Sequence, residues 1–239
     1  MDIHIEVRDA HCLPLTAGSV DLFFADPPYN IGIKYADGIP DRMPSDLYTM
    51  FTMKWIDEAI RVLSDTGTLW FLLPDELVAD AVLYCKNSKL TMRNWIKWYE
   101  TFGNNCKTKF SRTSRHLLYF VKDPKSFTFN ADAVRIPSAR QTKYKDKRAK
   151  SGGKVPDDVW EISRICGTFK ERIEGAPTQL PVKLLERVIL STSNPGDLVV
   201  DPFCGSGTTP FVCKETGRRC CAYDLSRTYV SMAKQRCGC

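Results

Sequence analysis

A short polar motif directly follows an apolar stretch of the chain. Residues 20–25 (VDLFFA) end at Asp26-Pro27-Pro28-Tyr29. The Asp26 carboxylate and the Pro27 carbonyl both accept hydrogen bonds, and the proline rings keep the backbone between them stiff. Two fixed acceptors suit an amino group on an aromatic ring, because its delocalised lone pair must be freed before the nitrogen can act as a nucleophile. Tyr29 would offer such a ring an aromatic face.

A glycine motif follows a second apolar stretch near the C-terminal end. Residues 201–209 (DPFCGSGTT) lie between the run at 198–200 and a helical pattern. Gly205 and Gly207 would let the backbone approach a ligand, and the helix beyond offers unpaired N–H groups. The Gly-Lys-Ser/Thr of a phosphate loop and the third glycine of a dinucleotide fingerprint are both missing. The motif therefore predicts a ligand other than a nucleotide phosphate.

Three carboxylates end apolar runs: Asp26, Asp201 and Asp224. Ligands of open parallel sheets bind at the carboxyl ends of the strands, so these acids are expected on one edge. There Asp224 could accept hydrogen bonds from ribose hydroxyls. Any one of them alone could equally be a turn or cap residue. Together they predict one site.

The hydrophobic pattern alternates between strands and helices, which predicts an α/β fold whose parallel sheet is covered on both faces. Ser45 is the expected cap of the first helix and Thr66-Gly67 the expected turn after it. Residues 95–99 and 117–121 are expected to form an antiparallel edge. The other strands are predicted at residues 3–7, 20–25, 68–73, 198–201 and 219–224, and the helices at 45–63, 76–85, 181–190, 208–216 and 226–235.

The two motifs, taken together, resemble those of the amino-methyltransferases of DNA, in the group whose catalytic motif precedes its cofactor motif. The likeness covers nearly the whole chain except a basic insertion. Residues 177–181 (PTQLP) resemble the family segment that closes over the methionine end of the cofactor. Ala176 departs from the pattern, since the family usually has His there.

The resemblance implies a circularly permuted, Rossmann-like methyltransferase sheet. Residues 1–122 would be the catalytic half, 123–165 a target-recognition insertion and 166–239 the cofactor half. The strand ending at Asp9 would be displaced to the N-terminus, so the two termini should lie close together. The implied cofactor is S-adenosylmethionine, with Asp9 facing its adenine amino group. The implied cofactor residues are Asp9, Thr178, Gln179, Asp201, Phe203, Gly205, Gly207, Thr208 and Asp224.

The implied activity is methylation of adenine N6 in duplex DNA at a flipped-out base, with Asp26, Pro27, Pro28 and Tyr29 as catalytic residues. Cytosine-N4 methylation is the first alternative, although its enzymes more often carry Ser at the position of Asp26. A non-catalytic DNA-binding protein of this fold is another, and a nicotinamide oxidoreductase is disfavoured by the missing glycine. Cytosine-C5 methylation would need a Pro-Cys dipeptide, which the chain lacks.

Basic residues gather between Arg135 and Lys154, where eight lysines and arginines face the single acid Asp146. Such a run suits phosphate contacts, or equally a solvated loop. Arg140 and Gln141 could read base edges, and residues 30–44 are expected to form a mobile loop that orders over DNA. The candidate DNA contacts are Lys34, Arg42, Arg135, Arg140, Gln141, Lys143, Lys145, Lys147 and Arg148.

The composition favours one domain with an insertion, since 239 residues with 43% hydrophobic content can supply one core. The chain shows no long apolar run and no secretory signal, so we expect a cytoplasmic protein without a membrane partner. Its ten cysteines are then expected as reduced thiols, and their spacing predicts no metal site. The recognition sequence and the choice between monomer and homodimer stay open.

Overall fold

The strands form one sheet in the order β1-β8-β7-β2-β3-β5-β4-β6 in this computed structural model, which describes residues 2–103 and 105–239. Neighbours from β1 through β8, β7 and β2 to β3 are parallel, and β5 runs antiparallel to both β3 and β4. The predicted mixed α/β sheet is confirmed. The strands are β1 (Ile3–Val7), β2 (Val20–Ala25), β3 (Leu63–Leu73), β4 (Thr91–Tyr99), β5 (Ser114–Val121), β6 (Val159–Glu161), β7 (Leu198–Asp201) and β8 (Arg219–Asp224).

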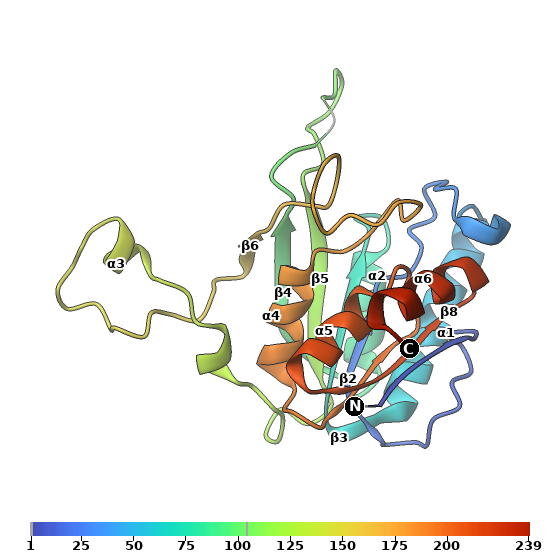
Figure 1. The fold of residues 1–239 in the computed structure, drawn as a ribbon, viewed down its shortest axis with the longest axis horizontal. Helices are drawn as coiled ribbons and strands as arrows, with labels where there is room; N and C mark the ends of the chain where they lie inside the picture. Colours follow the sequence, from blue (N-terminus) through green and yellow to red (C-terminus); the bar gives the residue numbers. More distant parts are fainter. Residues whose placement is uncertain (1, 104) are drawn as a thin grey trace.

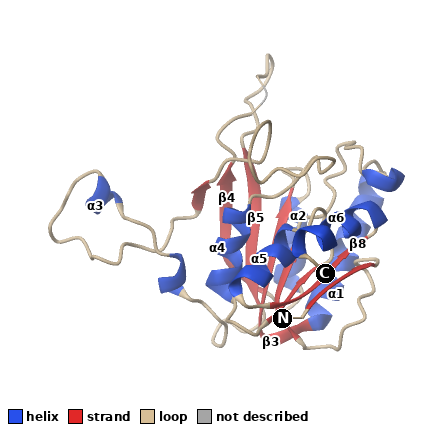
Figure 2. Cartoon of the chain, viewed as in Figure 1, coloured by secondary structure: helices blue, strands red, loops and turns tan. Residues whose placement is uncertain are grey.

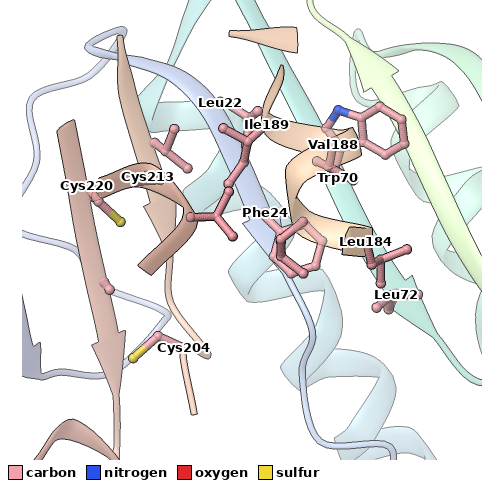
Figure 3. Packing of buried hydrophobic residues seen from close by; sticks show 14 of the residues in the cluster. Leu22, Phe24, Trp70, Leu72, Leu184, Val188, Ile189, Cys204, Cys213 and Cys220 are labelled. Atoms are coloured by element: carbon pink, nitrogen blue, oxygen red, sulfur yellow. The ribbon is translucent and has the colours of Figure 1, made fainter. Parts of the chain in front are cut away.

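Helices cover both faces of the sheet (Figures 1 and 2). On one face lie α1 (Ser45–Val62) and α2 (Val78–Asn87), and on the other α4 (Val182–Thr192), α5 (Thr208–Thr216) and α6 (Arg227–Cys237). Because side chains alternate along a strand, β3 sends Trp70 and Leu72 to the second face and Phe71 to the first. Figure 3 shows Leu22, Phe24, Trp70 and Leu72 packed against α4. The short helices are η1 (Ala36–Gly38), η2 (Ala131–Val134) and α3 (Ala139–Thr142).

The N-terminal and C-terminal ends of the chain meet in space, as predicted. β1 pairs in parallel with β8, and the Asp2 carbonyl accepts a hydrogen bond of 3.0 Å from the Cys220 N–H. Figure 1 shows the two ends beside each other, with α6 next to β1. The sheet is therefore continuous across the two ends of the sequence.

Three local predictions were wrong. Pro44 takes the cap position of α1, so Ser45 begins the helix and makes no capping bond. The expected turn at Thr66-Gly67 lies inside β3, where a register shift against β2 brings the Gly67 backbone close to the carbonyl of Val20. The third concerns β6, which lies within the predicted insertion yet joins the sheet beside β4. Only the part that carries α3 projects away from the sheet (Figure 1).

The structure also bears on membranes, thiols and metals. Within residues 2–103 and 105–239, no helix is both long and apolar enough to cross a membrane. Cys85, Cys204, Cys213, Cys220 and Cys237 are buried free thiols. The same residues contain no group of three or more His, Cys, Asp or Glu side chains that could hold a metal ion.

Candidate active site

A cavity of about 540 Å³ lies at the carboxyl ends of β1, β2, β7 and β8. Asp9, Asp26, Asp201 and Asp224 follow or end these four strands, and all of them line the cavity. The cavity also contains every other predicted catalytic and cofactor residue except Gly207: Pro27, Pro28, Tyr29, Thr178, Gln179, Phe203, Gly205 and Thr208. The sheet thus brings the two sequence motifs, whose first residues Asp26 and Asp201 are 175 positions apart, to one cavity.

The catalytic motif is fixed by two tyrosine hydroxyls. Tyr29 donates a hydrogen bond of 2.9 Å to Asp26 Oδ1, and Tyr48 from α1 donates one of 2.8 Å to the Pro28 carbonyl. Oδ2 of Asp26 takes no hydrogen bond from the described residues. Burial raises the pKa of Asp26 to about 7, although the Tyr29 bond and the Arg115 charge act against it. Asp26 therefore offers one open oxygen that can exchange a proton near neutral pH.

Arg115 and Glu100 form a charged pair on the cavity wall that the sequence analysis missed. Arg115 Nε lies 3.3 Å from Glu100 Oε1, and Glu100 is only 5% exposed. The Arg115 guanidinium carbon lies 5.3 Å from the centre of the Tyr29 ring, so the cation covers one face of that ring. The face that Tyr29 could offer to a base is then the opposite one.

The loop of residues 201–209 is organised by Asp201. This buried carboxylate accepts from Phe203 N at 2.9 Å and from the Thr209 hydroxyl at 2.5 Å, which closes the turn after β7. Burial raises the pKa of Asp201 to about 7, and the charges of Asp26 and Asp224 add to the rise. The carboxyl groups of Asp26, Asp201 and Asp224 therefore lie in one cavity and influence the pKa of Asp201.

The two glycines of this loop have different roles. Gly205 has a φ of +49°, and a Cβ there would meet no atom within 4 Å, so it leaves space at the cavity wall. Gly207 has a φ of +80°, but its missing Cβ would lie 2.7 Å from Cα of Ala233 in α6. Gly207 is therefore needed for the packing of the loop against α6, and its predicted contact with a ligand stays a prediction.

Asp224 and Asp9 lie on the side of the cavity formed by β8 and β1. Asp224 accepts from Gly205 N at 3.0 Å and from Ser226 N at 2.8 Å, and burial raises its pKa. Each carboxylate oxygen has a second lone pair, so Asp224 can still accept from a ligand hydroxyl. Asp9 accepts from the His11 N–H at 2.9 Å. Both acids line the cavity, and their predicted contacts with the adenine and the ribose stay predictions.

Gln179 and Thr208 use their polar atoms within the protein. Gln179 accepts from Ile173 N at 2.8 Å and donates to the Glu171 carbonyl at 2.6 Å. The Thr208 hydroxyl donates to the Leu180 carbonyl at 3.1 Å. These two predicted cofactor residues thus shape the wall of the cavity by holding residues 171–180 in place.

Residues 30–44 are held together by internal hydrogen bonds. The buried Asp41 carboxylate accepts from the backbone N–H groups of Asn30, Ile31 and Ile33 at 2.7, 3.2 and 2.8 Å. Asp37 accepts from Ser226 and Thr228 at the first turn of α6, which closes the loop over the cofactor half. Internal hydrogen bonds and contacts with α6 hold this loop, and its expected ordering over DNA stays a prediction.

The predicted DNA contacts lie outside the cavity. Arg140 and Arg148 both pair with Asp146, at 2.6 and 3.1 Å. Gln141 takes part in a capping box with Ser138 and donates to the Ser151 carbonyl at 3.1 Å. The two groups expected to read bases, Arg140 and Gln141, are therefore held by partners inside the insertion.

The strand ends also position the residues that the sequence analysis missed. Glu100 directly follows β4 and Arg115 is the second residue of β5, just as Asp26 follows β2. A carboxylate at a strand end was the signal that identified Asp26, and it would also have identified Glu100. The lining also includes the aromatic residues Tyr35, Tyr48, Phe51, Trp98 and Tyr229.

Comparison with known proteins assigns the family. Residues 20–235 match the model of the DNA methylase family. The chain belongs to this family. It is 37% identical over 223 residues to the type II methyltransferase M.HpaI of Haemophilus parainfluenzae, across 93% of this chain and 69% of that protein. It is 36% identical over 230 residues to the DNA adenine methyltransferase YhdJ of Escherichia coli (strain K12), across 93% of this chain and 77% of that protein.

Solved structures of DNA methylases share the fold. A complex of M1.HpyAVI with SAM superposes with a TM-score of 0.69 at 21% identity, across 98% of each chain. The cytosine-N4-specific PvuII DNA methyltransferase superposes with a TM-score of 0.76 at 16% identity, across 99% of this chain and 86% of that one. At these identities the likeness concerns the architecture, which this DNA methylase shares over nearly its whole length.

The residues of the cavity fit S-adenosylmethionine, the cofactor of DNA methylases. Its volume lies in the range of small-molecule sites. The charge of Asp26 adds to the raised pKa of Asp201, and a cationic sulfonium bound near these acids would offset that repulsion. Asp224 and Asp9 would hold the ribose and adenine, and Gly205 leaves room for the ligand.

Proposed function

We propose that this DNA methylase transfers the methyl group of S-adenosylmethionine to N6 of adenine in duplex DNA, at a base flipped into the cavity. The proposal depends mainly on Oδ2 of Asp26, which takes no hydrogen bond from the described residues and is followed by the Pro27 carbonyl in the chain. Both residues line the same cavity as the loop of residues 201–209. An amine needs both acceptors, and a methyl donor must lie within reach of its nitrogen.

The chemistry follows from the positions of these acceptors. Asp26 Oδ2 and the Pro27 carbonyl accept the two amino hydrogens, which favours a tetrahedral nitrogen with a free lone pair. When bound, the cofactor supplies a methyl group on a cationic sulfur. As the N–C bond forms, the sulfur–methyl bond breaks and its electron pair stays on sulfur; the nitrogen then carries an extra proton, which Asp26 can accept because its pKa is about 7.

Adenine is favoured over cytosine by two observations. The motif begins with Asp26, where cytosine-N4 enzymes more often carry Ser. The similar protein YhdJ is named a DNA adenine methyltransferase. Both bases present an amino group that the same acceptors could bind. The identity of the methylated base in the product therefore distinguishes adenine-N6 from cytosine-N4 methylation.

The insertion is proposed to contact the DNA. Its lysines at positions 143, 145 and 147 are exposed, and such residues neutralise backbone phosphates. Arg135, Arg140, Gln141 and Arg148 would reach DNA only after exchange of their present partners, while Lys34 and Arg42 lie in the loop beside the catalytic motif. Salt dependence of DNA binding would measure the phosphate contribution.

Mass spectrometry of nucleosides tests the reaction. Unmethylated DNA is incubated with the protein and S-adenosylmethionine, then digested, and N6-methyldeoxyadenosine is the expected product. N4-methyldeoxycytidine alone would overturn the assignment of the base, and no methylated base would overturn the function. Asp26→Ala should abolish transfer while cofactor affinity stays within about tenfold, because Asp26 acts on the reacting geometry. Asp65→Ala is the matched control, since that carboxylate is exposed on β3 and lies outside the cavity.

A further inference from the structure

A loop rises directly from the wall of the active site. Residues 101–113 connect β4 to β5, and the residues at its two feet, Glu100 and Arg115, both line the cavity. Figure 1 shows this segment in green, projecting above the ends of β4 and β5. Whatever enters the cavity from that side passes this loop.

The base of the loop is anchored. Glu100 N donates a hydrogen bond of 2.8 Å to the Thr113 carbonyl, which ties the two arms together. Arg112 Nε lies 3.1 Å from Asp75 Oδ2, and Arg112 also pairs with Glu76 ahead of α2. The Arg164 guanidinium carbon lies 4.3 Å from the centre of the Phe102 ring, in a contact with the neighbouring loop. These contacts hold the base of the loop in place beside the cavity.

Phe110 stands in the outer part and is 98% exposed, more than any other large apolar side chain of the described residues. The next most exposed, Tyr144, is 67% exposed. Two lysines, Lys107 and Lys109, lie beside it, and residues 101–113 contain no acid. A bare aromatic ring flanked by cations suits a partner with stacked rings and phosphates, which describes DNA.

We propose that residues 105–113 form a wedge that inserts Phe110 between base pairs next to the flipped base, while Lys107 and Lys109 contact phosphates. This inference rests on the proposed action at a flipped base. Apolar side chains that enter a base step unstack it, and flipping also requires unstacking. Five residue steps of at most about 3.3 Å each separate Phe110 from Arg115 at the cavity wall, so Phe110 can lie up to about 16 Å from that wall and enter the base stack.

Unwinding of a closed circular plasmid tests the wedge without knowledge of the recognition sequence. Relaxed plasmid is saturated with protein, treated with a topoisomerase and freed of protein, and the linking number is read on a gel. We expect wild type and Phe110→Trp to lower the linking number and Phe110→Ala to lose most of this effect. Leu83→Ala is the matched control, since it removes a side chain that is 60% exposed on α2. Equal unwinding by wild type and Phe110→Ala, or no unwinding by wild type, would overturn the wedge.

Methyl transfer to the same plasmid gives a second measurement. Phe110→Ala should lower the rate on duplex DNA by about tenfold with unchanged affinity for S-adenosylmethionine and unchanged melting temperature, and Phe110→Trp should restore it. Wild-type rates in Phe110→Ala would contradict the proposal. If wild type transfers no methyl to any DNA, the proposed function fails, and the unwinding assay still decides on the wedge.

Discussion

At the scale of single residues, the Asp26 carboxyl group sets the pH dependence of the protein. Its pKa is raised to about 7 by burial, and only the ionised form can accept both an amino hydrogen and the released proton. We therefore expect kcat/KM to fall about tenfold for each pH unit below 7. The pH–rate profile of methyl transfer measures this. A rate that stays constant down to pH 5 would contradict the role of Asp26.

The charged pair beside Asp26 should shift that profile in opposite directions. The Arg115 charge lowers the pKa of Asp26 and the Glu100 charge raises it. Arg115→Met should therefore move the acid limb to higher pH and Glu100→Gln should move it to lower pH. Both variants would show the wild-type profile if the pair were only structural. The opposite signs separate this electrostatic role from a general loss of activity.

The same raised pKa lowers the stability of the folded protein. The unfolded carboxyl titrates near 3.8 and the folded one near 7, so the unfolded state gains stability as pH rises between these values. Above pH 7 the loss of folding stability caused by the buried Asp26 carboxylate reaches its full value. Asp26→Asn should raise the free energy of unfolding by about 2–4 kcal/mol at pH 8 and by much less at pH 5. Denaturant titrations at both pH values measure this, and equal gains would contradict it.

At the scale of elements, the contact of the Asp201 loop with α6 depends on Gly207. A Cβ at Gly207 would lie 2.7 Å from Cα of Ala233 and would keep a φ of +80°. We expect Gly207→Ala to lower the free energy of unfolding by about 2–4 kcal/mol, through both the clash and the strain. Gly196→Ala is the control, because its φ of +88° adds strain but its Cβ would meet open space. Equal losses in the two variants would mean that the α6 contact contributes nothing.

Asp37 holds the loop of residues 30–44 on the first turn of α6. Hydrogen bonds from Ser226 and Thr228 lower its pKa to about 2, so these contacts are lost only as pH falls from 3.8 toward that value. Asp37→Ala should increase hydrogen exchange in residues 31–41 and speed the release of S-adenosylmethionine several-fold. Asp46→Ala, at the exposed first turn of α1, is the control. Unchanged exchange in Asp37→Ala would show that the remaining hydrogen bonds of the loop, including those of Asp41 and Asn30, are sufficient to order it.

At the scale of the whole molecule, the sequence predicted the features that depend on neighbouring residues in the chain, such as the limits of the strands. Strands such as β7 are apolar runs that stop at an acid or a proline, so their limits could be inferred. β6 pairs with β4, which lies about sixty residues earlier in the chain. β6 has only three residues, and so short a segment has too little hydrophobic pattern to predict this pairing. The pair of Glu100 and Arg115 depends on the register of Tyr99 against Ser114, and the role of Gly207 on the position of α6. Such features require the tertiary structure.

The adjacency of β1 and β8 implies that the order of the two halves is free to change. Joining the native ends with a short Gly-Ser linker and opening the chain at Thr168, in an exposed turn, would place the cofactor half first. We expect this permutant to fold, with the circular dichroism spectrum of the wild type and methyl transfer within about tenfold. A permutant opened between Val199 and Val200, inside buried β7, should not fold. Failure of both would show that the chain must run unbroken from β6 to α4, and that pairing between the two ends of the sequence is not sufficient to hold the halves together.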